Sequence, residues 1–95
     1  GPPVTADELR AALQPALAPE SLEVQDDSHL HAGHAGAREG GHFSVRIVAA
    51  RFAGLSRVAR HRLVYDALQG LAARRIHALA IDARAPGEAA GTSSR

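Results

Sequence analysis

The chain has 95 residues, of which 45% are hydrophobic and 3% aromatic, and this length fits one small domain with a modest core. It has no cysteine, which excludes disulfides, zinc knuckles and thiol chemistry, and its aromatic side chains are too few for a base-stacking surface. No apolar run approaches the ~18 residues of a membrane span, and no signal peptide is visible, so we expect no contact with a membrane.

The formal net charge of +1 conceals an uneven distribution of charge. Residues 1–45 carry two arginines against seven acidic side chains, whereas residues 46–95 carry nine arginines against three. A basic half of this kind suits an acidic partner or a phosphate backbone, although solvation alone explains such charge about as often.

The N-terminal stretch predicts a capped helix. Thr5 is placed to cap it, Glu8 three residues later completes a capping box, and Val4 and Leu9 have the spacing of a hydrophobic staple. The apolar positions that follow are Leu9, Leu13, Ala16 and Leu17. Pro15 lies inside this pattern and predicts a kink or an early end of the helix, because it removes one backbone hydrogen bond.

Two strands joined by a long loop are predicted next. Residues 21–27 alternate apolar and polar, and residues 42–52 do so more strongly. Residues 28–41 contain four glycines and three histidines without periodicity, which predicts a mobile loop between antiparallel strands. A loop near this length in a small domain is often functional.

A second helix and a third strand complete the pattern. A turn at Gly54 leads into the helix, with Ser56 placed to cap it. The expected inward positions of this helix are Val64, Ala67, Leu68 and Leu71. A helix of roughly 15 residues can place the apolar run 76–84 parallel to the second strand. Residues 85–90 are expected to form at most one helical turn, and residues 91–95 a disordered tail.

The order helix, strand, strand, helix, strand predicts an α+β fold within one domain of residues 1–90. One three-stranded mixed sheet would carry the helices on one face. Four stretches in this order resemble the signature of the BolA family: Asp27-Ser28-His29-Leu30-His31-Ala32-Gly33-His34-Ala35-Gly36, His42-Phe43-x-Val45, Phe52-x-Gly54 with Arg60-His61-Arg62-x-Val64-Tyr65, and Ile76-His77-Ala78-Leu79. The resemblance implies an αββαβ(α) fold related to the class II KH domain. The Thr-Pro-Glu-Glu-Trp that ends the third strand in many members is replaced here at residues 85–89, which weakens the prediction of a final helix.

The resemblance also implies a [2Fe–2S] cluster shared with a monothiol glutaredoxin. In the family the histidine of the His-Ala-Leu motif is a ligand, which makes His77 the first candidate. A second ligand, Cys or His, comes from the loop; here it must be histidine, and we rank His31 ahead of His34 and His29 last. On the residues alone, His77 would more often be a half-buried strand histidine. The loop histidines would then be solvated, or fortuitous binders of zinc or nickel.

Such a cluster would have asymmetric ligation. Two imidazoles would bind one iron, and the partner's cysteine and a glutathione thiolate would bind the other. Imidazole ligands raise the reduction potential and titrate near neutral pH. Because the chain has no cysteine, we expect the isolated protein to hold no cluster and the glutaredoxin heterodimer to be required.

The second helix begins with three arginines that suggest another function. Arg57, Arg60 and Arg62 could contact phosphates or an acidic partner, and Arg60 and Arg62 are expected to face outward. The alternative is therefore a DNA-binding transcriptional regulator that uses helix 56–74. The Gly33-His34-Ala35-Gly36 match to the KH loop lies between the first two strands, which weakens direct RNA binding in the KH manner.

An enzyme is the least favoured class. The sequence contains no nucleophile with a matching base, no carboxylate pair in a pocket and no phosphate-cradling loop. We therefore expect no catalytic residues and no small-molecule substrate. Bacterial cytoplasm, mitochondrion and plastid are all consistent with the sequence.

Overall fold

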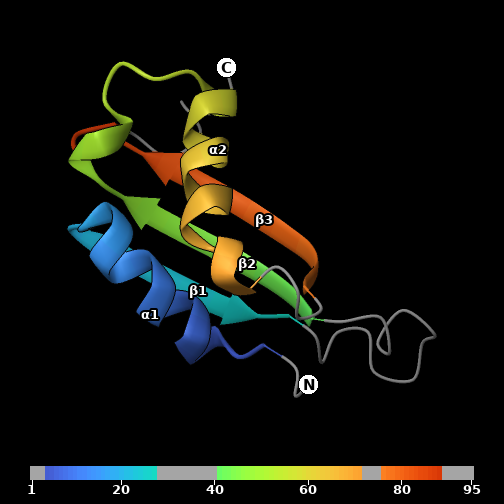
Figure 1. Cartoon of the computed structure of the whole chain (residues 1–95). Coiled ribbons are helices and arrows are strands. Elements are labelled where there is room, and N and C mark those ends of the chain that lie inside the picture. The colour runs from blue at the N-terminus through green and yellow to red at the C-terminus, as the bar shows by residue number, and fades with distance from the viewer. Residues whose placement is uncertain (1–3, 28–40, 72–75, 89–95) are drawn as a thin grey trace.

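The structure is a computed structural model that describes residues 4–27, 41–71 and 76–88, with only the backbone described for residues 76–78 (Figure 1). The elements are α1 (Ala6–Leu17), β1 (Ser21–Asp26), β2 (Gly41–Val48), the 3₁₀ helix η3 (Ala50–Phe52), α2 (Arg57–Ala67), the 3₁₀ helix η4 (Gln69–Leu71) and β3 (Ile76–Arg84). Among these residues no helix is long and apolar enough to cross a membrane. The predicted tail at residues 91–95 and most of the predicted loop lie outside the described residues.

The predicted capping box at the start of α1 is confirmed. The Glu8 amide donates to Thr5 Oγ1 at 3.1 Å, and the Thr5 amide donates to Glu8 Oε1 at 3.0 Å. Val4 and Leu9 are both buried, as the staple requires. The start of α1 is therefore fixed by local contacts that its own sequence encodes.

Two details predicted for this helix are wrong, namely an early end at Pro15 and the inward position of Ala16. α1 continues past Pro15 to Leu17, because Pro15 is exposed and water can bond the carbonyl that its missing amide leaves free. Ala16 is exposed rather than inward, since the buried stripe follows every fourth residue and consists of Leu9, Leu13 and Leu17. The helix ends at Ala18, whose φ of 45° is left-handed and whose amide donates to the Gln14 carbonyl at 2.9 Å.

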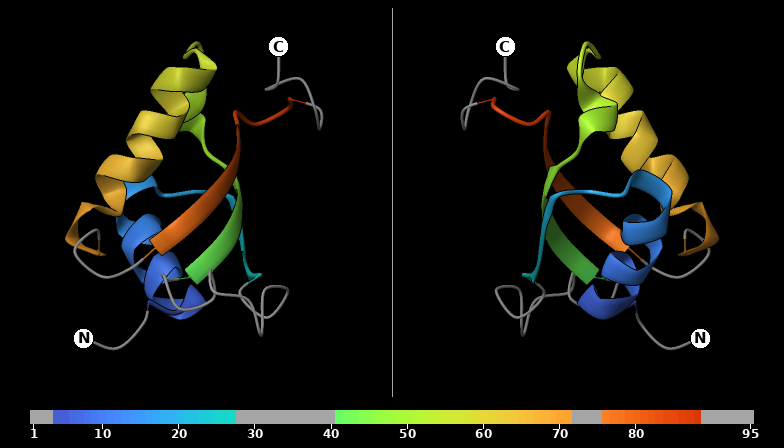
Figure 2. Two further views of the ribbon diagram at one scale, coloured as in Figure 1. Left: turned by 90° about the vertical axis from the view of Figure 1, so that its right-hand side faces the viewer. Right: turned by 90° about the vertical axis from the view of Figure 1, so that its left-hand side faces the viewer.

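The strands of the described residues form one three-stranded sheet in the order β1-β2-β3. β1 pairs antiparallel with β2, and β3 pairs parallel with β2, as predicted. Figure 2 shows α1 and α2 on the same face of this sheet. The α+β architecture with a mixed sheet covered on one face is thereby confirmed.

The core lies between the sheet and the two helices. Its largest fully buried side chains are Phe52, Leu9, Leu13, Ile47, Val45 and Val64. The prediction that the second strand reaches residue 52 is wrong, because β2 ends at Val48 and Phe52 enters the core from η3. The turn after η3 contains Gly54 with φ 76°, a left-handed conformation that glycine adopts without strain.

α2 matches the predicted pattern but is shorter than the roughly 15 residues expected. The Ala59 amide donates to the Ser56 hydroxyl at 3.1 Å, which confirms the cap. Val64 and Leu68 are buried, and after Ala67 the chain tightens into η4. The sequence predicts at most one helical turn at residues 85–90, and the described residues 85–88 contain no helix. Residues 85–88 form a turn in which Gly87 has φ 89° and the Glu88 amide donates to the Ala85 carbonyl at 3.1 Å.

Candidate functional site

Three chain segments meet at one end of the sheet. Because β1 is antiparallel and β3 parallel to β2, the end of β1 lies beside the starts of β2 and β3. We call this end, formed by Asp27, Gly41, His42 and Ile76–Ala78, the loop edge (Figure 1). The Asp27 amide donates to the His42 carbonyl at 2.7 Å, and the Ser44 hydroxyl donates to Asp27 Oδ2 at 2.5 Å. Both ends of the histidine-bearing segment 28–40 are therefore anchored at the loop edge.

The pairing between β2 and β3 is interrupted at His77. Gly41 pairs with Ile76 and His42 pairs with Ala78, which leaves His77 as the extra residue on β3. A bulge of this kind bends the strand and re-aims the side chains around it, and bulges are over-represented at sheet edges and next to functional sites. The backbone thus places the first ligand candidate at an irregularity of the loop edge.

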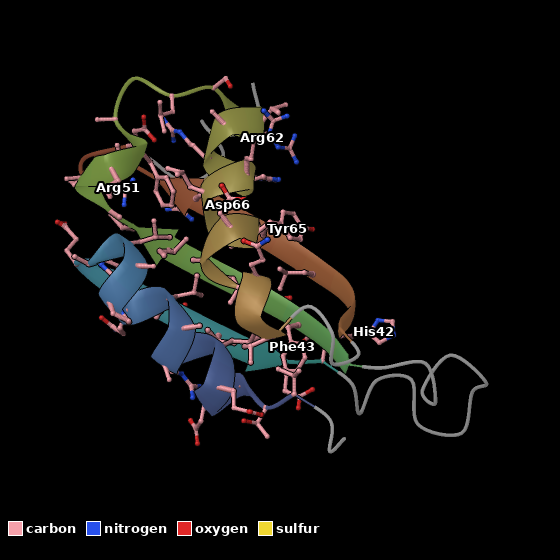
Figure 3. The ribbon with its side chains drawn as sticks, in the orientation of Figure 1. His42, Phe43, Arg51, Arg62, Tyr65 and Asp66 are labelled. Atoms are coloured by element: carbon pink, nitrogen blue, oxygen red, sulfur yellow. The ribbon has the colours of Figure 1, made fainter. Side chains whose placement is uncertain are left out.

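His42 is a second histidine at this edge, and the sequence reasoning gave it no ligand role. Its side chain is half-buried, with a buried Nε2 atom, and Figure 3 shows it on the opposite side of β2 from Phe43. The signal that could have found it is the parallel pairing of β2 and β3. Because two parallel strands begin at the same end of a sheet, a histidine near the start of each lies near the other.

The two loop candidates cannot be placed against this geometry. His31 and His34 lie outside the described residues, and so does the side chain of His77. Within the described part of the chain, no group of three or more His, Asp or Glu side chains could hold a metal ion. The structure therefore locates the strand that carries His77 and both ends of the loop, while the ligand set stays a prediction.

The glycine that returns the chain to the sheet is required by close packing. A Cβ atom added at Gly41 would lie 2.3 Å from Cε2 of the Phe43 ring, which is far inside van der Waals contact. Phe43 is itself buried in the core, so its ring has little room to move. The start of β2 is thus packed directly against the core.

One of the three arginines of α2, Arg60, is not on the surface, which corrects the prediction that it faces outward. Arg60 is only 6% exposed. Its Nε donates to the Leu55 carbonyl at 3.0 Å, and its Nη1 donates to the Ala83 carbonyl at 3.1 Å. Nη1 and Nη2 donate to the two carboxylate oxygens of Glu88 at 2.6 and 2.9 Å. Arg60 therefore joins α2 to β3 and to the turn after it, and it is not available to a phosphate.

The Arg60–Glu88 pair also sets the protonation of its members. The hydrogen bonds from Arg60 lower the pKa of the Glu88 carboxyl to about 2, and the Ala85 amide, which donates to it at 2.9 Å, adds to the effect. The bond to Glu88 raises the pKa of Arg60. Arg62 is exposed, as predicted, and Arg57 is exposed too. The half-buried His61 has its pKa lowered by burial and by the charge of Arg57.

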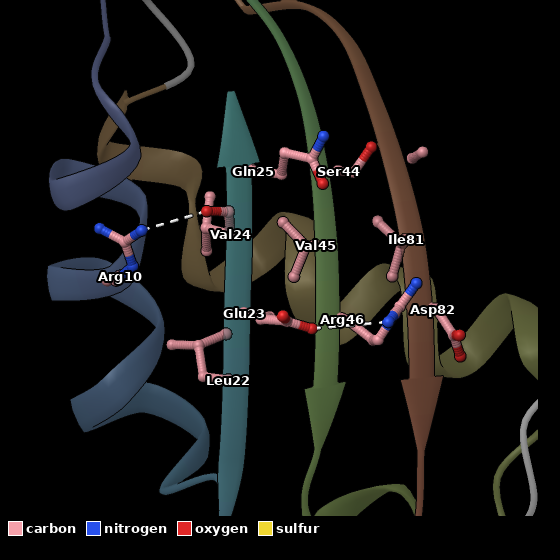
Figure 4. Close-up of a pocket in the computed structure, with 11 residues that line it drawn as sticks. Arg10, Leu22, Glu23, Val24, Gln25, Ser44, Val45, Arg46, Ile81 and Asp82 are labelled. Atoms are coloured by element: carbon pink, nitrogen blue, oxygen red, sulfur yellow. Dashed lines mark hydrogen bonds and ion pairs between the residues drawn. The ribbon is translucent and has the colours of Figure 1, made fainter. Parts of the chain in front are cut away.

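The face of the sheet opposite the helices carries an open hollow of about 650 Å³ (Figure 4). Its charged groups are engaged within the chain. Arg46 pairs with Glu23 at 3.5 Å, and Arg10 donates to the Val24 carbonyl at 3.1 Å. Asp82 at its border accepts from Arg84. Among the described residues that line the hollow, none is a predicted site residue.

The fold and the loop edge together define an α+β module in which the strands that carry His42 and His77 begin at one end of a mixed sheet. The family model described as "BolA-like protein" matches residues 13–88. The chain therefore belongs to the BolA family, a family of non-enzymatic proteins.

Individual relatives agree with this assignment. BolA-like protein 1 from Mus musculus is 46% identical over 80 residues, which cover 84% of this chain and 57% of the mouse protein, so the chain spans just over half of that relative. The DNA-binding transcriptional regulator BolA from Vibrio cholerae is 44% identical over 75 residues, 79% of this chain and 69% of that protein. The solved structure of BolA1 from Arabidopsis thaliana superposes with a TM-score of 0.77 at 39% identity, covering 94% of this chain and 99% of that one.

Proposed function

We propose that this protein binds a monothiol glutaredoxin and shares a [2Fe–2S] cluster with it, as an adaptor in iron–sulfur cluster trafficking. The observation that carries the proposal is the bulge at His77, beside both ends of the segment that bears His31 and His34. One strand ligand and one loop ligand need this arrangement, because both must reach the same iron. His77 and either His31 or His34 would then bind that iron.

The chemistry of the chain supports sharing over independent binding. Protein-held [2Fe–2S] clusters are commonly ligated by cysteine thiolates, and this chain has none. The thiolates of the second iron would come from the glutaredoxin cysteine and from glutathione. Imidazole ligands on the first iron would make transfer of the cluster sensitive to pH near neutrality.

The test is a titration of cluster-loaded glutaredoxin with the purified chain, followed by visible absorption and circular dichroism. The wild-type chain should change the cluster spectrum and His77→Ala should not. Single His31→Ala and His34→Ala variants should show which loop histidine binds, and His29→Ala, in the same loop, is the matched control. An unchanged spectrum with the wild-type chain would reject cluster sharing.

A second function, binding of duplex DNA by α2, is supported by the regulator from Vibrio cholerae among the relatives. Arg57 and Arg62 are the exposed cations that could contact phosphates, and the burial of Arg60 removes the third. If DNA binds here, affinity should fall steeply with salt. The Arg57→Ala/Arg62→Ala double variant should reduce the slope of log K against log salt by about 2. Arg46→Ala, on the opposite face of the sheet, is the control, and a salt-insensitive affinity would reject this function.

A further inference from the structure

A row of residues crosses the sheet at the loop edge. Asp27 follows β1 and stands opposite His42 of β2, where its amide donates to the His42 carbonyl at 2.7 Å. On the other side of β2, His42 pairs with Ala78 of β3. Figure 3 shows His42 on the opposite side of β2 from Phe43, which is buried in the core. The row therefore belongs to the face of the sheet that the helices do not cover.

The bulge in β3 brings His77 into this row. With regular pairing, His77 would stand opposite Gly41, in the row of β3 that packs against the core. Ile76 instead pairs with Gly41, so His77 stands with Ala78 opposite His42. In a bulge, two residues of one strand oppose a single residue of its neighbour. The irregularity thus takes His77 out of the core-facing row and places it beside His42.

The backbone spacing of these two histidines suits one metal ion. Neighbouring strands lie about 4.8 Å apart and successive Cα atoms about 3.8 Å apart, so we expect about 6 Å between the Cα atoms of His42 and His77. Two histidines four residues apart on a helix have a similar separation, because each residue rises about 1.5 Å. Such a pair binds zinc in the His-Glu-x-x-His motif. The loop edge therefore has a histidine spacing that is known to hold metal.

A carboxylate stands on the other side of His42. The Ser44 hydroxyl donates to Asp27 Oδ2 at 2.5 Å, which holds this carboxylate over β2 on the open face. Residues directly opposite each other on antiparallel strands have Cβ atoms about 5 Å apart, so Asp27 is a close neighbour of His42. A histidine that binds a metal usually donates its other ring N–H to a carboxylate, which fixes the ring and strengthens the ligand. Asp27 has the position that this supporting role requires.

We propose that His42 and His77 bind one divalent transition-metal ion of the Zn²⁺ class on the isolated chain, with Asp27 supporting His42. Imidazole ligands suit Zn²⁺, Ni²⁺ and Cu²⁺, whereas Mg²⁺ and Ca²⁺ prefer oxygen. The described side chains of His42 and Asp27 make only two of the three groups that a metal cluster needs, and His77, whose side chain lies outside the described residues, is the third. The site does not depend on the proposed function. The ion and the iron–sulfur cluster would exclude each other, because both use His77.

The test is titration calorimetry of the metal-free chain with Zn²⁺, without glutaredoxin or glutathione. The wild type should bind one ion, and His42→Ala and His77→Ala should each weaken binding about tenfold or more. Asp27→Asn should also weaken it about tenfold, as the loss of a supporting carboxylate does. Far-ultraviolet circular dichroism checks that each variant folds. Nuclear magnetic resonance of the wild type gives a second measurement, because the ring signals of His42 and His77 should shift as Zn²⁺ is added.

The other four histidines of the chain supply the controls. Three of them lie in the segment 28–40 and bind zinc fortuitously if any histidines do. A variant with all three changed to alanine should bind Zn²⁺ as the wild type does. The fourth, His61, is half-buried on α2, and His61→Ala should also leave the affinity unchanged.

The outcomes separate this site from cluster sharing. No binding of Zn²⁺ by the wild type, or equal affinity of the wild type, His42→Ala and His77→Ala, would overturn the site. Loss of binding in the triple variant with unchanged binding in His42→Ala would assign the ion to the segment 28–40 and overturn it as well. If Zn²⁺ binding depends on His42 and His77 while the zinc-free chain leaves the cluster spectrum unchanged, the site stands and the proposed function fails.

Discussion

Replacing Arg60 with alanine tests a buried side chain that makes four hydrogen bonds. The change removes two bonds to the Glu88 carboxylate and one each to the carbonyls of Leu55 and Ala83. Arg60 is 6% exposed, so its contacts with the turn before α2, with β3 and with the turn after β3 are made largely out of water. The Ala83 carbonyl would be left without this donor.

The expected destabilisation is large for an arginine. Removing one partner of a buried ion pair costs about 3–5 kcal/mol. Because the side chain of Glu88 is 33% exposed and water can reach it after the change, we expect the lower end, about 3 kcal/mol. A small domain of total stability near 5–15 kcal/mol would lose a substantial part of it.

Urea unfolding followed by circular dichroism measures this loss. With an m value of about 1–2 kcal/mol per molar urea, the midpoint should fall by roughly 2 M. Arg60→Lys keeps the charge but not the planar fork of donors. Its urea midpoint should therefore lie between those of the wild type and Arg60→Ala. A loss below about 0.5 kcal/mol for Arg60→Ala, typical of surface pairs, would refute the reasoning.

Three further predictions concern stability. Because the folded state lowers the pKa of Glu88 from 4.5 to about 2, its carboxylate stabilises the fold fully above pH 4.5, and this part is lost as the pH falls toward 2. In urea unfolding between pH 5 and 2, Glu88→Gln should not show this pH-dependent loss of stability. A dependence of stability on pH identical to that of the wild type would contradict the prediction. Thr5→Ala should cost about 1 kcal/mol and Thr5→Ser little, by thermal unfolding. Gly41→Ala should cost about 1–3 kcal/mol in the same assay, since its Cβ collides with Phe43; no change would mean that the ring moves freely.

Local signals in the sequence predicted the element order, the caps and the strand pairing. The capping box at Thr5, the cap at Ser56 and the alternation in β2 depend on neighbouring residues, so they can be read without tertiary structure. Features that depend on distant contacts could not be read. Glu88, the partner of Arg60, is 28 residues away, and no local pattern joins them.

The wrong assignment of Arg60 has an instructive cause. Its charge suggested solvent, whereas its position four residues before Val64 places it on the buried stripe of α2. The same holds for His42, whose nearness to the strand of His77 follows from parallel pairing rather than from spacing in the sequence. Position within the helix indicates the burial of Arg60 better than residue type does.

At each edge of the sheet, an arginine side chain binds a backbone carbonyl that faces away from β2. The Asp27 amide bonds the His42 carbonyl, so in the β1–β2 register every second residue of β1 bonds to β2. Val24 is one of the residues between, and its carbonyl faces away from β2. Arg10 of α1 binds this carbonyl. The bond from Ala49 to the Arg84 carbonyl likewise turns the Ala83 carbonyl outward, to Arg60. A strand arriving from another molecule would have to displace an arginine at either edge. The side chains that tie the helices to the sheet thus also oppose edge-to-edge aggregation.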